Sequence, residues 1–167
     1  ARPGRPPVAG AGRFHAAKIA LDRLTVPNVG ATADSGPMLF DQVVRTSARV
    51  TATRSRTAKV AALAETLAEA APDELEIVAH YLSGSLRQRR TGVGWRSLTT
   101  RPDPANAPSL TIAAVDTAFA ELATLSGTGS QTARQALLAE LMAAATGAEQ
   151  ALLAALVTGE TRQGALE

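Results

Sequence analysis

The 167-residue sequence contains no cysteine, so it can form neither a disulfide bond nor a thiolate metal site. Aromatic residues make up only 3% of the chain, and the runs of β-branched and aromatic residues that favour strands are scarce. No apolar stretch approaches the roughly 20 residues that a membrane-spanning helix requires. These absences argue against a disulfide-stabilised domain, a β-rich domain and a membrane protein.

Residues suited to catalysis are also few. His15 and His80 are the only imidazoles, which leaves almost no material for a histidine metal site or a catalytic triad. The acidic residues are scattered without a close pair, as two-carboxylate hydrolysis would need. Gly92 and Gly94 lack the third glycine of a dinucleotide-binding fingerprint, and no Gly-Lys-Ser/Thr sequence follows any glycine loop. We therefore predict no catalytic residue, no metal and no cofactor in this chain.

Alanine, leucine and valine supply most of the hydrophobic residues, and alanine and leucine are strong helix formers. The length suits one ordinary domain. The net charge is only +2, but residues 1–60 hold ten Lys or Arg against three Asp. Such an asymmetry predicts one basic face that attracts polyanions, although an ordinary solvated surface explains the charge alone equally well.

Residues 1–37 differ from the rest of the chain because they are rich in proline, glycine and arginine. We predict a disordered or extraneous tail, with at most a short helix over residues 14–24. A targeting peptide, a tag, a linker and a wrongly chosen upstream start are all open explanations. Met38 is a plausible true start, and the predicted domain covers residues 38–167.

From Met38 onward, apolar residues recur at three- and four-residue steps and predict six helices, an all-α multi-helix bundle. The first three apolar stripes consist of Leu39, Phe40, Val43, Val44, Ser47 and Val50; then Val60, Leu63, Ala64 and Leu67; then Leu75, Val78 and Leu82, in a helix beginning at Pro72. The last three consist of Ile112, Val115, Phe119 and Leu122, in a helix capped by Ser109; then Leu137, Leu138, Leu141 and Met142; then Leu152, Leu153, Leu156 and Val157.

The predicted sixth helix has clear signals at both ends. Thr146 and Glu149 form a capping box at its start, and Gly159 ends it. Residues 162–167 then resemble the entry to another helix, so we expect the domain to be truncated at its C-terminus.

Four loops at helix junctions carry arginine together with hydroxyl residues, glycine or both, a composition suited to binding phosphate. Most informative is the loop after the third helix, where Arg87, Arg89, Arg90 and Arg96 surround a Gly-Val-Gly turn. Each loop alone is explained by ordinary capping and solvated charge, but four in one bundle favour a polyanion. The predicted contact residues are Thr53, Ser55, Arg56 and Lys59; Arg87, Arg89, Arg90, Gly92 and Gly94; Ser126, Gly127, Gly129, Ser130 and Thr132; and Arg162, Gln163 and Gly164.

The segments at residues 38–67, 81–98 and 126–167, in this order, resemble the N-terminal DNA-binding domain of ATP-dependent DNA ligases, most closely the bacterial ligase B type. The resemblance covers about 130 residues and is most specific in the pieces RTGVGW and RQGALE. It implies an all-helical domain that lies against the minor groove of nicked duplex DNA and holds both sides of the break through the backbone. It also implies that the four loops make this contact, in a bacterial cytoplasmic enzyme.

The resemblance further implies that ATP and Mg²⁺ act through catalytic domains of the same polypeptide, and that this chain is inactive alone. Neither Lys18 nor Lys59 stands in the Lys-x-Asp-Gly motif of the family's adenylation domain. Thr161 stands where the family usually has an apolar residue. A protein-protein interaction module without a nucleic-acid role is the alternative, with Trp95 and the alanine-rich helices docking a partner.

Overall fold

The computed structural model describes residues 36–88, 90–98 and 101–159. Within these ranges the chain forms six α-helices and one short 3₁₀ helix, which confirms the predicted all-α fold. They are α2 (Phe40–Ala52), α3 (Arg56–Glu69), α4 (Leu75–Leu82), η1 (Trp95–Leu98), α5 (Ile112–Thr124), α6 (Ser130–Ala144) and α7 (Gly147–Thr158). The predicted tail and its helix over residues 14–24, and the predicted continuation at residues 162–167, lie outside the described residues.

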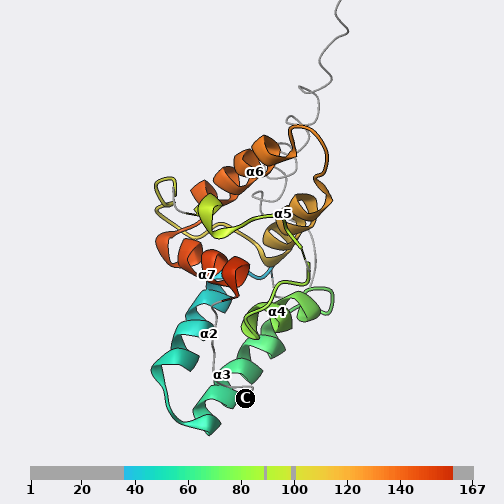
Figure 1. The fold of residues 1–167 in the computed structure, drawn as a ribbon. Helices are drawn as coiled ribbons and strands as arrows, with labels where there is room; N and C mark the ends of the chain where they lie inside the picture. Colours follow the sequence, from blue (N-terminus) through green and yellow to red (C-terminus); the bar gives the residue numbers. More distant parts are fainter. Residues whose placement is uncertain (1–35, 89, 99–100, 160–167) are drawn as a thin grey trace, which may run out of the picture.

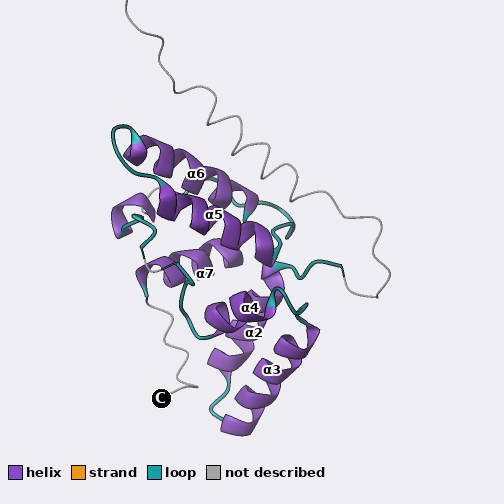
Figure 2. Ribbon diagram, turned by 90° about the vertical axis from the view of Figure 1, so that its right-hand side faces the viewer, coloured by secondary structure: helices purple, strands orange, loops and turns teal. Residues whose placement is uncertain are grey.

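The helices are arranged along one long direction of the molecule. Helices α2 and α3 form an antiparallel pair at one end, and α5 and α6 pack together at the other (Figures 1 and 2). Helices α4 and α7 lie between them, since α4 contacts α2, α3 and α5 while α7 contacts α2 and η1. The turns between the paired helices therefore lie at opposite ends of the bundle.

The starts of α2 and α5 are joined by backbone hydrogen bonds. Phe40 N donates to Leu110 O at 2.8 Å, and Ile112 N donates to Met38 O at 2.9 Å, around an isolated antiparallel bridge between Leu39 and Thr111. These bonds satisfy amides that a helix N-terminus leaves without intrahelical partners. The helical periodicity gave no sign of this bridge.

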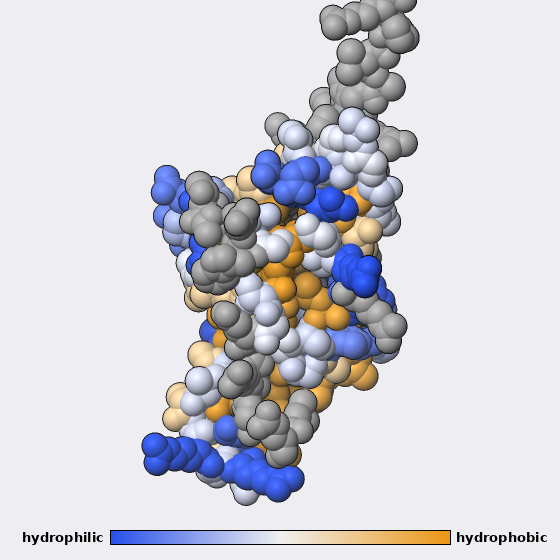
Figure 3. All heavy atoms as spheres, viewed as in Figure 1, coloured by the Kyte–Doolittle hydropathy of each residue, from blue (hydrophilic) through white to orange (hydrophobic). Residues whose placement is uncertain are grey.

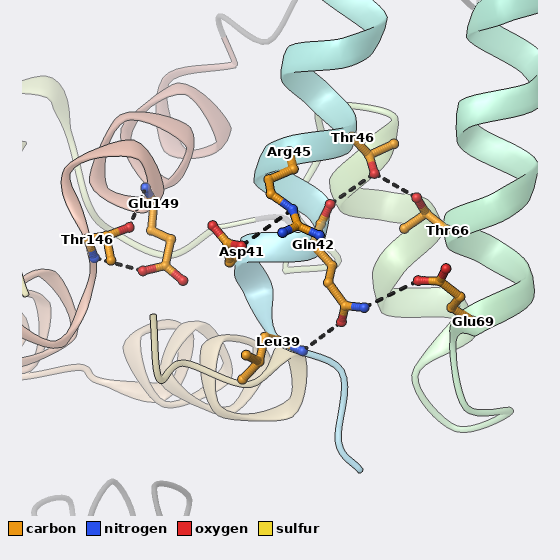
Figure 4. A network of polar contacts seen from close by, with 9 residues as sticks. All are labelled: Leu39, Asp41, Gln42, Arg45, Thr46, Thr66, Glu69, Thr146 and Glu149. Carbon is orange, nitrogen blue, oxygen red and sulfur yellow. Dashed lines mark hydrogen bonds and ion pairs between the residues drawn. The ribbon is translucent and has the colours of Figure 1, made fainter. Parts of the chain in front are cut away.

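Polar side chains connect α2 to α3, as Figure 4 shows. The Gln42 side chain accepts from Leu39 N at 3.1 Å and donates to Glu69 at 3.3 Å. Further along, the hydroxyls of Thr46 and Thr66 lie 2.6 Å apart in the buried interface. Because each buried hydroxyl has a partner, these threonines pack between the helices without an unsatisfied polar group.

The central core follows most of the predicted stripes. Its largest fully buried side chains include Phe40, Tyr81 and Phe119, and the rings of Phe40 and Tyr81 meet edge to face with centroids 5.7 Å apart. Two predicted stripes were partly wrong. In α3, Val60 and Ala64 are exposed, and in α4, Leu75 is 43% exposed.

The helix ends correct two further predictions and confirm two others. Thr111, and not Ser109, caps α5, since its hydroxyl accepts from Ala114 N at 3.1 Å. Pro72 begins a turn rather than a helix, and α4 starts only at Leu75. The capping box at the start of α7 and the left-handed C-cap at Gly159 (φ +71°) are confirmed.

The buried carboxyl of Glu74 connects α4 to the start of α2 by accepting from Met38 N at 3.4 Å. Burial raises the pKa of Glu74 above its model-compound value of 4.5, and the Met38 amide only partly offsets this. The folded chain therefore binds this proton more tightly than the unfolded chain does. The resulting stability is complete below pH 4.5 and is lost as the pH rises through the folded-state pKa.

Glu74→Gln should therefore become progressively more stable relative to the wild type between pH 4 and pH 7, because Gln keeps the acceptor and carries no charge. Urea unfolding of both proteins at several pH values measures this difference. Taking the difference between the two proteins cancels the other titrating groups. A difference that does not change with pH would show that Glu74 titrates alike in the folded and unfolded states.

Candidate nucleic-acid interface

The α2–α3 turn forms the first basic surface. Arg54, Ser55 and Arg56 are exposed and Lys59 is half-buried, immediately before and within the first turn of α3. No ion pair joins these cations to any residue that the structure describes. By contrast, the neighbouring Arg49 on α2 pairs with Glu65 at 2.9 Å. The charge at the turn is therefore available, and it lies beside the positive end of the α3 dipole.

The predicted hydroxyls of this turn already accept hydrogen bonds. Ser55 Oγ accepts from Ala58 N at 3.3 Å and so caps α3, while Thr53 Oγ1 accepts from Ser55 N at 3.2 Å. A hydroxyl that accepts in this way can still donate its own hydrogen. Both side chains are consequently oriented by the backbone and can donate to an anion.

The loop from residue 87 to η1 begins with two side chains that bind Asp116 of α5. Arg87 Nη2 forms an ion pair with Asp116 Oδ2, and Gln88 Nε2 donates to Asp116 Oδ1 at 2.8 Å. The Asp116 side chain is 7% exposed and that of Arg87 42%. The Arg87 guanidinium thus neutralises a buried carboxylate, so the structure assigns it a partner within the chain.

Tyr81 packs beside this ion pair. Its ring is fully buried and its hydroxyl has no hydrogen-bond partner among the described residues. Burial, with the Asp116 carboxylate nearby, raises the pKa of Tyr81 far above its usual range. The phenol therefore remains neutral, and it contributes packing rather than charge to this part of the loop.

The middle of the loop is the exposed part. Arg90 is exposed, and no ion pair connects it to a described residue. Gly92 adopts φ +67°, a conformation that favours glycine, and Gly94 accepts from Ser97 N at 3.0 Å as η1 begins. Arg89 lies outside the described residues, and so do the side chains of Trp95 and Arg96. Arg90 is therefore the described cation of this loop whose charge is not already paired, since the exposed Arg87 is bound to Asp116.

The α5–α6 turn is built by two glycines in the left-handed conformation, Gly127 (φ +80°) and Gly129 (φ +83°). Ser126, Gly127 and Gly129 are exposed, and Gly129 is the N-cap of α6, with no side-chain cap. The amide of Ser130 donates to Gly127 O at 3.2 Å, and the next amides of α6 open towards solvent beside Thr132, which is also exposed. Ser130 is half-buried, and its hydroxyl accepts from Arg134 at 3.2 Å.

Arg134 brings the second and third predicted loops together. Its guanidinium donates through Nη2 to Leu125 O and through Nη1 to Ser130, at the two sides of the α5–α6 turn. The same guanidinium lies against Gly92, where an added Cβ would come within 2.5 Å of Arg134 Nε. The two loops, on either side of α5 in the sequence, therefore meet at this side chain.

The predicted contacts thus divide into two surfaces at opposite ends of the bundle. The α2–α3 turn lies at one end, and the residue 87–94 loop with the α5–α6 turn lies towards the other (Figures 1 and 2). Figure 3 shows strongly hydrophilic residues at the end where Figure 1 places the α2–α3 turn. Arg162, Gln163 and Gly164 lie outside the described residues. Sequence reasoning did not include Arg134, although its position four residues after Ser130 was a usable signal.

Comparison with known proteins indicates the family of this chain. Residues 95–167 match the protein family described as DNA ligase N terminus. A probable DNA ligase of Beutenbergia cavernae is 59% identical over 130 residues, which are 78% of this chain and 25% of that protein. The chain belongs to the DNA ligase N-terminal family. The expected resemblance is therefore confirmed.

Two further relatives of this ligase N-terminal chain also carry the name of a DNA ligase. A probable DNA ligase of Nocardioides sp. is 54% identical over 138 residues, covering 80% of the chain and 27% of the relative. The DNA ligase B of Mycobacterium tuberculosis is 51% identical over 130 residues, covering 77% and 26%. The chain therefore spans about a quarter of the length of the relatives it matches.

Two further observations concern the described part of the ligase N-terminal chain only. None of its helices is long and apolar enough to cross a membrane. No group of three or more His, Cys, Asp or Glu within the described ranges could hold a metal ion. In the described residues, the groups suited to contact with an anion are the backbone amides of loops and helix N-termini and the exposed cationic side chains.

Proposed function

We propose that this chain is the DNA-binding part of an ATP-dependent DNA ligase and holds nicked duplex DNA through backbone and minor-groove contacts. Catalytic domains of the same polypeptide, acting with ATP and Mg²⁺, then seal the nick in the bacterial cytoplasm. The observation that carries the proposal is the pair of basic surfaces at opposite ends of a bundle from the DNA ligase N-terminal family. Two separated surfaces suit a ligand that is long, regular and anionic.

The chemistry of the surfaces supports contact with phosphate rather than with base edges. Exposed Arg54, Arg56 and Arg90 provide charge, and the amides at the start of α6 provide donors for phosphate oxygens. Such contacts position the protein along the duplex but read little sequence. We therefore expect the chain to bind nicked duplexes of different sequence with similar affinity.

The direct test is titration of the 167-residue chain into a fluorescently labelled nicked duplex at several salt concentrations. Release of counterions should make the logarithm of the affinity fall linearly with the logarithm of the salt concentration. A folded chain that binds no duplex even at low salt would contradict the proposal. It would favour the alternative of a protein-protein interaction module, whose partner should bind with little dependence on salt.

Replacing Arg89 and Arg90 together with alanine should weaken binding and reduce the salt slope by up to about 2, because each phosphate contact contributes about 0.9. The matched control is Arg45→Ala with Arg49→Ala, which removes the same charge from arginines paired to Asp41 and Glu65. The control should keep the wild-type slope. Equal slopes for both double variants would remove the residue 87–94 loop from the interface.

A further inference from the structure

We infer that Arg134 is a positioning residue for DNA binding, which fixes the residue 87–94 loop against the α5–α6 turn so that the two form one surface. The inference rests on the proposed DNA-binding function. It concerns a side chain that lies between the two loops and contacts groups of the chain itself. Its evidence is the set of contacts around the guanidinium.

The first contacts of Arg134 join two helix ends. Helix α5 has no basic residue in its last turn, and its C-cap is Leu125, whose carbonyl accepts from Arg134. The same guanidinium donates to Ser130, the first residue of α6. A cation at a helix C-terminus interacts favourably with the exposed carbonyls there. Arg134 thus fixes the α5–α6 turn from within.

The second contact extends this support to the other loop. An added Cβ at Gly92 would lie 2.5 Å from Nε and 2.8 Å from Cζ of Arg134, so only a glycine allows this close approach. Arg134 Nε is buried and has no hydrogen-bond partner among the described atoms. The planar guanidinium therefore packs beneath the loop backbone, with its Nε enclosed by protein.

Two geometric features separate this role from direct contact with phosphate. The guanidinium donates to a carbonyl and a hydroxyl of the chain, and its Nε is closed off by Gly92. Exposed Arg90, two residues before Gly92, is instead placed to meet an anion. Arg134 supports the loop from which Arg90 projects, and the fork shape of arginine is needed because three separate groups are contacted.

The first experiment needs no DNA. Gly92→Ala should push Arg134 away and increase amide hydrogen exchange of Ser130 and Ala133, whose amides donate to Gly127 O and Gly129 O at the α5–α6 turn, by several-fold, because exchange reports local opening. The matched control is Gly159→Ala, because Gly159 has a similar φ of +71° but nothing lies within 4 Å of the added Cβ. This control should leave exchange of the Ser130 and Ala133 amides unchanged. Equal exchange in the two variants would overturn the inference.

The second experiment compares Arg134→Lys with Arg134→Ala in binding to the nicked duplex. A positioning role predicts that both weaken binding alike, by about tenfold, because misplaced loops lose phosphate contacts and lysine cannot span three groups. Direct phosphate contact predicts that lysine keeps the wild-type affinity and salt slope, which would overturn the inference. Circular dichroism establishes that each variant is folded, and Gly92→Ala tests the same contact from the other side if Arg134→Ala unfolds.

The two experiments also separate this inference from the proposed function. A wild-type chain that binds no duplex would refute the proposed function and the binding role of Arg134. The exchange comparison would still decide whether Gly92 and Arg134 couple the two loops. Binding by the wild type, with an unaltered Arg134→Lys variant, would refute the inference alone.

Discussion

Replacing Phe40 with alanine should lower the free energy of unfolding by about 3–5 kcal/mol, the cost of removing a buried phenyl ring and leaving a cavity. Phe40 is fully buried at the start of α2, and its ring meets that of Tyr81 at 89°. Its backbone amide also bonds to Leu110, so the surroundings are fixed and can collapse little into the space. Urea unfolding followed by circular dichroism measures the change.

Val60→Ala provides the control for the core substitution. Val60 is also helical and hydrophobic, but it is 57% exposed on α3. Its replacement should change the free energy of unfolding by less than about 0.5 kcal/mol, because alanine is the better helix former and little buried area is lost. Similar losses for Phe40→Ala and Val60→Ala would show that the core is not packed around Phe40 in solution.

Arg87→Met should lower the free energy of unfolding by about 2–3 kcal/mol, because it leaves the buried Asp116 carboxylate without its charged partner. The loss should be smaller than that for a wholly buried pair, since the Arg87 side chain remains 42% exposed and is partly screened by water. Urea unfolding near neutral pH measures it.

The double variant Arg87→Met, Asp116→Leu tests the physical reason. Replacing both partners with apolar side chains removes the uncompensated charge and should restore most of the lost stability. Gln88 then loses the Asp116 Oδ1 acceptor but keeps the backbone oxygen of that residue, which accounts for a small residual loss. A double variant less stable than Arg87→Met would mean that Asp116 stabilises the fold through other contacts than its ion pair.

Helical periodicity predicted the fold best where one face of a helix enters the central core. Phe40, Val43 and Val50 were correctly placed because these large apolar residues recur on one face of α2, although Thr46 and Ser47 are buried there too. The same reasoning failed for α3, where Ala62 and Thr66 are the buried residues and Val60 is exposed. A small helix face that packs against one neighbour is specified by close approach and hydroxyl pairing, which hydrophobic periodicity does not detect.

The composition of the loops predicted where the candidate site lies, but it did not predict which groups the arginine side chains bind. The sequence indicated that the arginines after α4 form a loop suited to binding phosphate. The structure supplies a carboxylate for Arg87 from Asp116, on the α5 face that also carries Val115 and Phe119. That acid lies within an apolar stripe, so neither helical spacing nor local charge could connect it to the loop. For Arg134, the spacing to Ser130 was a usable signal, but the contact with Gly92 depends on tertiary packing and could not be predicted.

The bridge between Leu39 and Thr111 also bears on the order in which the chain can fold. Helices α2 and α3 are adjacent in sequence and can pair soon after both exist, at little cost in loop closure. The bonds from Phe40 to Leu110 and from Ile112 to Met38 require closure of a much longer loop. During synthesis, the face of α2 that carries Phe40 therefore stays uncovered until α5 has emerged. Completion of the core is a late event for this reason, and its timing is set by the topology of the chain.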